Sequence, residues 1–288
     1  MNKTNILPGF KPALGFTLLY LSLIVLIPLS TLLFKSIAPD SGLTWQGYLD
    51  IISNERVLAA FRVSFLASLL AAAIALVFGF VIAWTLVRYP LPGKRFFDAI
   101  IDLPFALPTA VAGIVLASLY APNGFIGQFF AKFGITVAFK PAGIVVALIF
   151  IGLPFIVRTI EPVLQEIDAS MEEAAASMGA SRWQIFQRII FPNILPAALT
   201  GFALAFARSV GEYGSVIFIA GNIPYVSEIV PLLIITKLEQ YDYAGPTALA
   251  LTMLLVSFFL LLMINLLQLL LRRRTSGKEE SLTLSVVK

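Results

Sequence analysis

The sequence predicts an all-α membrane protein with six transmembrane helices. Hydrophobic residues make up 59% of the 288 residues, and charged residues make up only 12%. Several uncharged runs are longer than the roughly 20 residues that a helix needs to cross a bilayer. The charged residues gather between these runs, as they do in the loops of a multi-span protein.

Six apolar runs account for the expected spans. The first, 12–34, is too long for the apolar core of a signal peptide, so we expect an uncleaved anchor. The fourth run stops at Arg158, and the sixth stops before three consecutive arginines that begin at Arg272. The expected spans are 12–34, about 63–87, about 102–121, about 142–157, about 196–220 and a segment within 243–271.

The distribution of basic residues sets the expected topology. Six spans place both termini on one side, together with the turn at Arg88 and the loop 161–192 with Arg158 just before it. That side carries 13 Lys and Arg residues, against six in the other loops. The positive-inside rule therefore places it in the cytoplasm. We expect a cytoplasmic N-terminus (1–11), a six-helix transmembrane domain (12–271) and a cytoplasmic tail (272–288).

The composition excludes several chemistries. The chain has no cysteine and no histidine, which removes thiol nucleophiles, thiolate metal sites and the commonest general base. The GxxxxGK pattern of a nucleotide-binding loop is also absent. We therefore expect no catalytic residues, no metal and no cofactor on this chain, and any nucleotide that it uses must bind to another chain.

The loop 161–192 is a long charge-bearing segment in a mostly apolar chain, and its pattern predicts two short helices. Ser170 with Glu173 matches a capping box, and Gly179 is a typical left-handed end for that helix. Ser181 with Gln184 repeats the box and opens a second helix, which we expect Pro192 to end. The loop is thus predicted to be a sharply turned element between the fourth and fifth spans.

Three functions are open to this loop on residue type alone. It could be a solvated connection, which is the ordinary role of such a loop. It could be a helix-turn-helix, because Ala175, Gly179 and Ile185 have the spacing that this motif favours. Five acidic and two basic residues give the loop a net charge of −3, which repels phosphate and argues against nucleic acid. The third role is docking to a partner.

The docking role is supported by a resemblance. Six loop residues match the EAA loop of ABC-importer permeases, in which EAA is followed by three residues, Gly, nine residues and I-x-L-P. Phe191 departs from the leucine of that pattern. In the family this loop forms the coupling helix that fits a groove on the ATPase subunit. The matching residues are Glu173, Ala174, Ala175, Gly179, Ile189 and Pro192.

Four further segments, 88–93, 102–113, 154–158 and 208–222, resemble the sulfate/molybdate branch of these permeases, and most closely the T-type subunits of sulfate/thiosulfate importers. The resemblance covers roughly residues 12–270. It implies a type I importer fold in a bacterial inner membrane and import of sulfate or thiosulfate by alternating access. The implied partners are a dimer of ATP-binding ATPase subunits, a W-type second permease, a periplasmic sulfate- or thiosulfate-binding protein and membrane lipid.

Other substrates and mechanisms remain open at this point. Molybdate and tungstate are also tetrahedral dianions, and the residues alone do not separate them from sulfate. An ion-coupled secondary transporter is a second class, although the sequence has no clear internal repeat and few carboxylates within its spans.

Arg208 and Glu212 are charges within the expected fifth span, spaced to share one helix face. Charge at this depth should face the bundle interior, a cavity or a subunit interface. The two residues could simply neutralise each other, or Arg208 could attract a dianion in transit while Glu212 weakens its binding. Gly211 and Gly214 suggest a close helix approach or a break in the span.

The third span begins with two prolines, Pro104 and Pro108, which must disturb its first turns. They are candidate gate or hinge residues, although prolines are common in membrane helices without that role. Asp102 is expected to cap this helix or to pair with Arg95.

Overall fold

The computed structural model describes residues 10–37 and 44–286, without the side chains of 33, 35–37 and 270–286, and the regular secondary structure within these ranges is entirely helical. The expected N-terminus lies almost wholly outside them, as do the side chains of the tail. The helices of the first half are α1 (Phe10–Leu21), a π-helical turn (Ser22–Leu26), α2 (Ile27–Ile37), α3 (Trp45–Ser53), α4 (Glu55–Arg88), α5 (Lys94–Ala106), α6 (Thr109–Tyr120) and α7 (Gly127–Ala131). The second half contains α8 (Pro141–Glu166), α9 (Ala169–Ser177), α10 (Arg182–Ile185), a π-helical turn (Phe186–Ile190), α11 (Phe191–Val210), α12 (Val216–Ile219), α13 (Val230–Glu239) and α14 (Ala244–Val286).

Five helical segments are long and apolar enough to cross a membrane: 10–32, 55–88, 141–166, 182–210 and 244–269. One more crossing, the third in chain order, is made by a broken pair of helices, α5 and α6, bent by 112° at Leu107–Pro108. Six crossings result when this pair is counted as one. The number agrees with the sequence prediction, but the third crossing is not the single helix that we expected.

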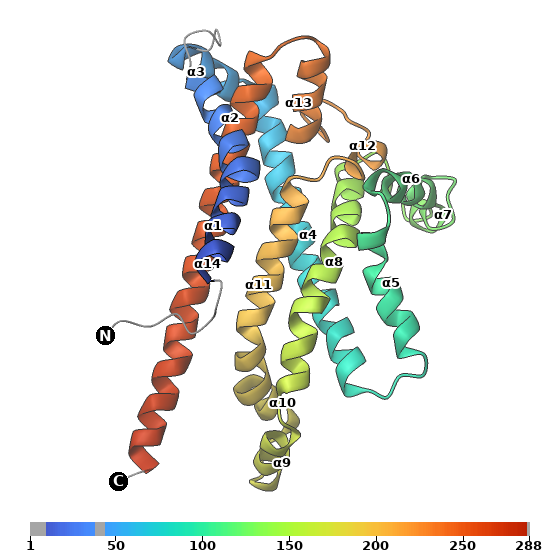
Figure 1. Ribbon diagram of the computed structural model, residues 1–288. Coiled ribbons are helices and arrows are strands. Elements are labelled where there is room, and N and C mark those ends of the chain that lie inside the picture. The colour runs from blue at the N-terminus through green and yellow to red at the C-terminus, as the bar shows by residue number, and fades with distance from the viewer. Residues whose placement is uncertain (1–9, 38–43, 287–288) are drawn as a thin grey trace. The chain divides into compact units, whose positions relative to one another are not determined.

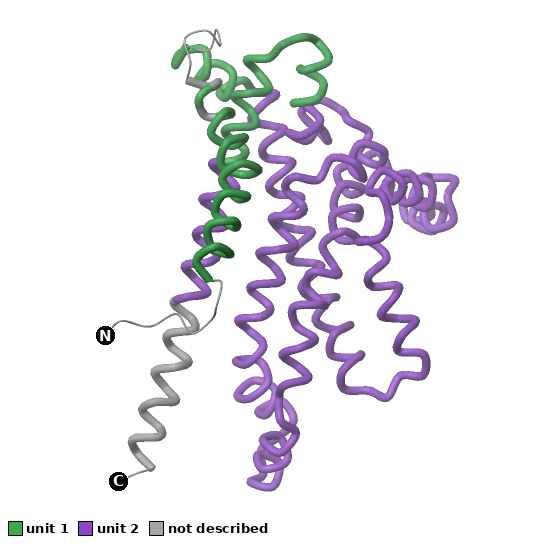
Figure 2. The backbone as a smooth tube through the Cα atoms, in the orientation of Figure 1, with its two compact units in different colours: residues 1–54, 234–254 green, residues 55–233, 255–288 purple. Residues whose placement is uncertain are grey.

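The chain divides into two compact units, shown in Figure 2. Unit 1 comprises 1–54 and 234–254. In it, α3 is held to the first turns of α14 by a hydrogen bond of 2.8 Å between the hydroxyls of Tyr48 and Thr252. Unit 2 comprises 55–233 and 255–288 and contains the loop 161–192.

The core of unit 2 is formed by α4, α8 and α11, which pack side by side (Figure 1). Small residues make this close packing possible. A Cβ on Gly79 of α4 would lie 2.7 Å from Cγ2 of Ile156, and a Cβ on Gly201 of α11 would lie 3.1 Å from Cα of the same residue. Ile156 of α8 is fully buried between these two glycines. Three helices are therefore locked at one level of the bundle.

Several spans are longer than the apolar runs that predicted them. Helix α8 continues past Arg158 to Glu166, and α5 begins at Lys94 rather than near Asp102. The charged side chains of these extensions form ion pairs between α5 and α8, Lys94 with Glu161 and Arg158 with Asp102. The fifth span, in contrast, is shorter than predicted, since it was expected to reach residue 220. Helix α11 ends at Val210, with Gly211 as its C-cap.

Candidate functional site

The loop between α8 and α11 forms a tight elbow at one end of unit 2, beyond the ends of both helices (Figure 1). Helix α9 ends at Ser177, and the chain turns at Gly179, whose φ of 86° is left-handed, as predicted. The N–H of Gly179 donates to the carbonyl of Ala176 (2.9 Å), and that of Ala180 donates to Ala175 (3.0 Å). These two bonds form a Schellman motif, which satisfies the last carbonyls of α9. The chain therefore reverses at a defined angle.

The start of α9 differs from the prediction. Asp168, not Ser170, is the N-cap, and its carboxylate accepts a hydrogen bond of 2.9 Å from the N–H of Ser170. The predicted box of Ser170 with Glu173 is wrong because the helix begins at Ala169, which leaves Ser170 inside the first turn. The bonds from Ser170 hold the pKa of the Asp168 carboxyl below its ordinary value.

The second capping box is confirmed, but the helix that it opens does not end at Pro192. Ser181 Oγ accepts from the N–H of Gln184 (3.3 Å), and the Gln184 side chain accepts from the N–H of Ser181 (2.8 Å). Helix α10 then passes through a π-helical turn, Phe186–Ile190, directly into α11. The wider turn immediately before Pro192 makes room for a ring that would otherwise clash with the preceding turn. The elbow is thus rigidly continuous with the fifth span.

An aromatic cluster fastens the π-helical turn to α4. The ring of Phe186 lies 6.1 Å from those of Phe80, Trp84 and Phe191, and it stacks on Trp183 at 5.4 Å. Such pairs add about 0.5–1.5 kcal/mol each beyond the burial of their area. The side chain of Trp183 remains 64% exposed, so one side of the cluster is open to a partner.

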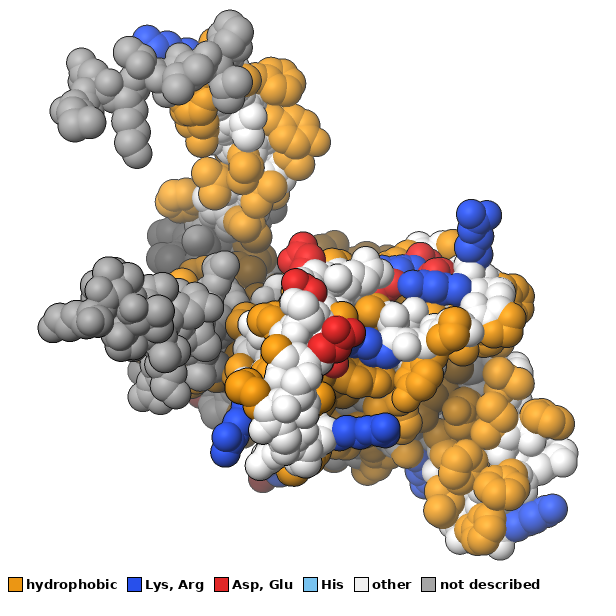
Figure 3. All heavy atoms as spheres, turned by 90° about the horizontal axis from the view of Figure 1, so that it is seen from below, with side chains coloured by type: hydrophobic (Ala, Val, Ile, Leu, Met, Phe, Trp, Pro, Cys, Tyr) orange, Lys and Arg blue, Asp and Glu red, His pale blue; other side chains and the backbone are white. Residues whose placement is uncertain are grey.

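Helix α9 is also tied to α4 by charge. Arg88, in the last turn of α4, donates to the carboxylate of Glu172, and its guanidinium lies 5.4 Å from the centroid of Trp84. Figure 3 looks onto this end of unit 2 and shows acidic side chains beside basic ones. The remaining outer face of the elbow carries exposed apolar side chains, of which Met178 is 82% exposed.

The six EAA residues divide between the core and the surface. Ala175 is buried, while Glu173, Ala174 and Gly179 are exposed, and Ile189 and Pro192 are half-buried. The six residues of the EAA pattern therefore lie around one elbow, and the outer face of this elbow is exposed.

A second charged cluster joins α5 to α8, and the sequence did not reveal it. Arg158 Nε and Nη2 lie 2.8 and 2.7 Å from the two carboxylate oxygens of Asp102. Its Nη1 donates to Glu161 (2.9 Å), which also lies 3.5 Å from Lys94 Nζ. Both predicted roles of Asp102 are wrong: it cannot cap the helix because α5 begins two turns earlier, and its carboxylate binds Arg158 rather than Arg95. The feature of the sequence that could have indicated this cluster is the pair Asp98 and Asp102, four residues apart in an apolar segment.

Arg208 and Glu212 form an ion pair of 2.6 Å, as one of the two readings expected. They are not on one helix face, because α11 ends between them and Glu212 lies in the irregular stretch that follows. The Glu212 side chain is 2% exposed and also accepts from the N–H and hydroxyl of Ser215 (2.9 and 3.0 Å). The Arg208 side chain is 38% exposed. The pair therefore presents its cation outward and hides its anion.

Helix α6 packs against the stretch that contains Glu212. A Cβ on Gly113 would overlap the backbone of Ser215, and a Cβ on Gly214 would overlap the side chain of Thr109. Gly214 therefore marks a close approach and Gly211 marks a break, so both expectations for these glycines are confirmed. Pro104 lies inside α5 and Pro108 is the N-cap of α6, at the bend. The break in the third crossing thus lies beside the break in the fifth.

A further ion pair, which the sequence did not reveal, holds the segment after α12. Arg56 Nε and Nη2 lie 2.8 and 2.7 Å from the carboxylate of Glu228, whose side chain is 4% exposed. Next to it, the N–H of Val230 donates to Ser64 Oγ (2.8 Å). These bonds fasten the segment to the first turns of α4, at the end of unit 2 that is remote from the elbow (Figure 1). The fold brings Arg56 and Glu228 together, and no spacing in the sequence predicts that they pair.

Residues 75–277 match the family of binding-protein-dependent transport system inner membrane components. The chain belongs to this family. The permease is also 46% identical, over 96% of its length and 99% of the relative's, to the sulfate transport system permease protein CysT of Salmonella typhimurium. It is 51% identical to the CysT protein of Synechococcus elongatus, over 88% of its own length and 90% of the relative's. The resemblance to the sulfate branch is therefore confirmed.

The permease fold is confirmed by solved structures. A bacterial ABC transporter involved in import of the acidic polysaccharide alginate superposes with a TM-score of 0.74 at 15% identity, covering 90% of this chain and 94% of that one. A structure of the bacterial alginate transporter with a periplasmic protein gives a TM-score of 0.72 at 17% identity, covering 89% and 92%. The chain is thus a multi-pass permease with the type I importer fold.

Proposed function

We propose that this permease moves sulfate or thiosulfate into the cytoplasm, driven by a separate ATPase, and that its own residues catalyse no reaction. Sulfate is the substrate class named for relatives that are 46–51% identical over most of the chain. The observation that carries the proposal is the elbow at Gly179, which matches the EAA spacing and presents a free apolar face.

The elbow is the proposed docking site for the ATPase. Met171, Met178 and Trp183 are exposed on it and offer large side chains to a groove, while the exposed Ala174 permits close approach. The Schellman turn, the π-helical turn and the aromatic cluster connect this surface rigidly to the spans. Displacement of the elbow would therefore move α8 and α11 rather than be absorbed.

Arg208 is the proposed point at which the anion meets the pathway. Its guanidinium is partly exposed, so it can attract a dianion without full loss of hydration. Glu212 behind it lowers the local positive potential, which keeps binding weak enough for release. Pro104 and Pro108 border the bend beside this stretch, and we propose that the bend acts as the gate.

The proposed assembly contains two ATPase subunits, this chain, a W-type permease as its heterodimer partner and a periplasmic sulfate- or thiosulfate-binding protein. The elbow and both termini would face the cytoplasm of a bacterial inner membrane. The excess of Lys and Arg on the elbow side supports this orientation.

Reconstitution tests the proposal. The assembled complex is placed in liposomes with the loaded binding protein outside and ATP inside, and uptake of radiolabelled sulfate is measured. We expect uptake that requires ATP and survives an ionophore that collapses ion gradients. Uptake that the ionophore abolishes and ATP does not support would contradict the proposal. Competition by thiosulfate, molybdate and tungstate identifies the preferred dianion.

A further inference from the structure

The segment between α12 and α13 carries four consecutive apolar residues, 223–226, at the end of unit 2 that is remote from the elbow (Figure 1). All four are exposed, and we call them the apolar tip. The four residues that follow, 227–230, are all buried. The loop therefore has an anchored base and a free apolar end. A run of exposed apolar residues is a liability in a folded protein unless it binds something.

The apolar tip lies beyond the depth of a membrane. Arg56 holds the base of the loop, and about 48 Å of helix, at 1.5 Å per residue, separates it from Arg88 in the last turn of α4. The hydrocarbon core of a bilayer is only about 30 Å thick. The tip is therefore expected to face water or another protein rather than lipid chains.

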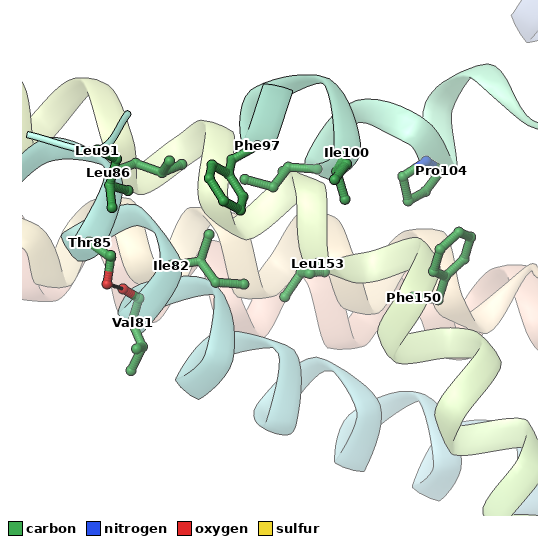
Figure 4. Close-up of a pocket in the computed structure, with 11 residues that line it drawn as sticks. Val81, Ile82, Thr85, Leu86, Leu91, Phe97, Ile100, Pro104, Phe150 and Leu153 are labelled. Atoms are coloured by element: carbon green, nitrogen blue, oxygen red, sulfur yellow. Dashed lines mark hydrogen bonds between the residues drawn. The ribbon is translucent and has the colours of Figure 1, made fainter. Parts of the chain in front are cut away.

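The largest apolar groove described in unit 2 differs in this respect. It lies between α4, α5 and α8, with a volume of about 450 Å³ (Figure 4). Ile82 and Leu86, which line it, are within two turns of Arg88 and thus at membrane depth. An apolar surface is expected at that depth. The apolar tip has no such explanation.

Hydrogen bonds hold the loop in one conformation before any partner binds. The carbonyl of Ile223 accepts from the N–H groups of Val226 and Ser227 (3.1 and 2.9 Å). It also accepts from the N–H of Glu228 (3.1 Å), whose carboxylate is held by Arg56. The N–H of Ile223 donates to the hydroxyl of Ser227 (3.0 Å), and this serine is fully buried. Little conformational entropy therefore remains to be lost when the tip binds.

Tyr225 is the most unusual residue of the tip. Its φ of 66° lies in the left-handed region, which a residue with a large side chain rarely adopts. Strain of this kind is kept where a surface has a function. The residue is 58% exposed, and tyrosine is enriched among the residues that dominate binding energy. Tyr225 is therefore suited to be the anchor of an interface.

We propose that the apolar tip docks the periplasmic binding protein, with Tyr225 as the anchor. The chain belongs to a family of binding-protein-dependent transport components. This surface rests on the proposed function, whose orientation places the tip outside the inner membrane, where a soluble periplasmic protein can reach it. The base of the loop is fastened to α4, and Arg88 at the other end of α4 donates to Glu172 of the elbow. Docking at the tip would thus act on a helix that is also tied to the elbow.

Binding of purified sulfate-binding protein, loaded with sulfate, to the assembled complex in nanodiscs tests the surface. Tyr225→Asn removes the ring and keeps the backbone, because asparagine tolerates a left-handed φ. We expect the dissociation constant to rise about 30-fold, as when an aromatic anchor is truncated. Tyr89→Asn is the matched control, since Tyr89 is 57% exposed but follows the opposite end of α4. This control should bind normally.

ATP hydrolysis separates docking from assembly. Without binding protein, the complex with Tyr225→Asn should hydrolyse ATP at the wild-type rate, and it should lose most of the increase that loaded binding protein causes. Equal binding by Tyr225→Asn and the wild type, or equal loss in Tyr225→Asn and Tyr89→Asn, would overturn the proposal while sulfate uptake by the wild type still supports the transport function. A wild-type complex that neither binds the protein nor takes up sulfate would contradict both.

Photo-crosslinking identifies the molecule that covers the tip. A benzoylphenylalanine at Val226, which is 47% exposed, should yield an adduct with the binding protein. An adduct with a second permease chain or with lipid would overturn the proposal. The absence of any adduct, in a complex that binds the protein, would overturn it as well.

Discussion

Arg158 holds Asp102 with two parallel hydrogen bonds, from Nε at 2.8 Å and from Nη2 at 2.7 Å. The two-armed geometry fixes both side chains, and it joins α8 to α5. Helix α8 leads into the elbow, and α5 leads to the bend at Leu107–Pro108. A movement of the elbow would therefore reach the bend through this ion pair.

Replacement of Asp102 tests that route. Asp102→Asn removes the charge but keeps the shape, so we expect the complex to assemble, to hydrolyse ATP and to transport sulfate more slowly. Because both side chains are more than a third exposed, the coupling energy from a double-mutant cycle with Arg158→Gln should be only about 0.5–1 kcal/mol. Asp50→Asn, at an exposed position in α3, is the control. Unchanged transport in Asp102→Asn would exclude this ion pair from the route.

Gly179→Ala tests the geometry of the elbow. Nothing lies within 4 Å of the added Cβ, so the only penalty is the left-handed φ of 86°, which costs other residues about 1–2 kcal/mol. We expect weaker binding of the ATPase subunit with an intact transmembrane domain, measured by co-purification. Gly15→Ala also adds a methyl group in open space, but without a positive φ, and should bind normally. ATPase binding unaffected by Gly179→Ala would show that the elbow angle is unimportant.

The sequence predicted features that depend on neighbours along the chain. Gly179 and the Ser181–Gln184 box were found because turn and cap chemistry is local. Asp168 was missed because two candidate caps, Asp168 and Ser170, lie within three residues, and only the starting point of the helix decides between them. The π-helical turn before Pro192 has no sequence signal of its own. Pro192 was therefore predicted to end a helix that in fact continues.

Contacts between distant segments were beyond prediction from one sequence. Arg158 with Asp102 and Arg56 with Glu228 are separated by 56 and 172 residues. Their charges were visible, but nothing in their spacing selects one partner among many. The bend at Pro108 was foreseen as a disturbance and not as an angle of 112°, because the direction of a break is set by packing.

Gly113→Ala tests the contact between the two broken crossings. The added methyl group would meet backbone atoms of Ser215, which cannot rotate away, so α6 must shift. We expect a loss of about 1–3 kcal/mol in stability, typical of an overpacked site, and a larger proportional loss of transport. Thermal unfolding and uptake are measured on the same preparation. A variant with normal stability and normal uptake would show that this close approach is not required.

Arg208 and Glu212 must be tested together. Arg208→Ala alone leaves a buried carboxylate without its cation, which costs about 1–3 kcal/mol and lowers transport for structural reasons. The double variant Arg208→Ala/Glu212→Gln removes that penalty, because the amide oxygen can still accept from Ser215. We expect it to recover stability but not sulfate uptake, whereas Arg208→Lys should retain part of the uptake. Normal uptake by the double variant would remove Arg208 from the pathway.

The orientation and role of the elbow are tested most directly with a single introduced cysteine. The chain contains no cysteine, so Met178→Cys places one label at the exposed tip of the elbow. In oriented vesicles, a membrane-impermeant maleimide should label this position only from the cytoplasmic side. Assembly with the ATPase subunit should then protect it. Labelling from the outer side, or equal labelling with and without the ATPase, would contradict the account.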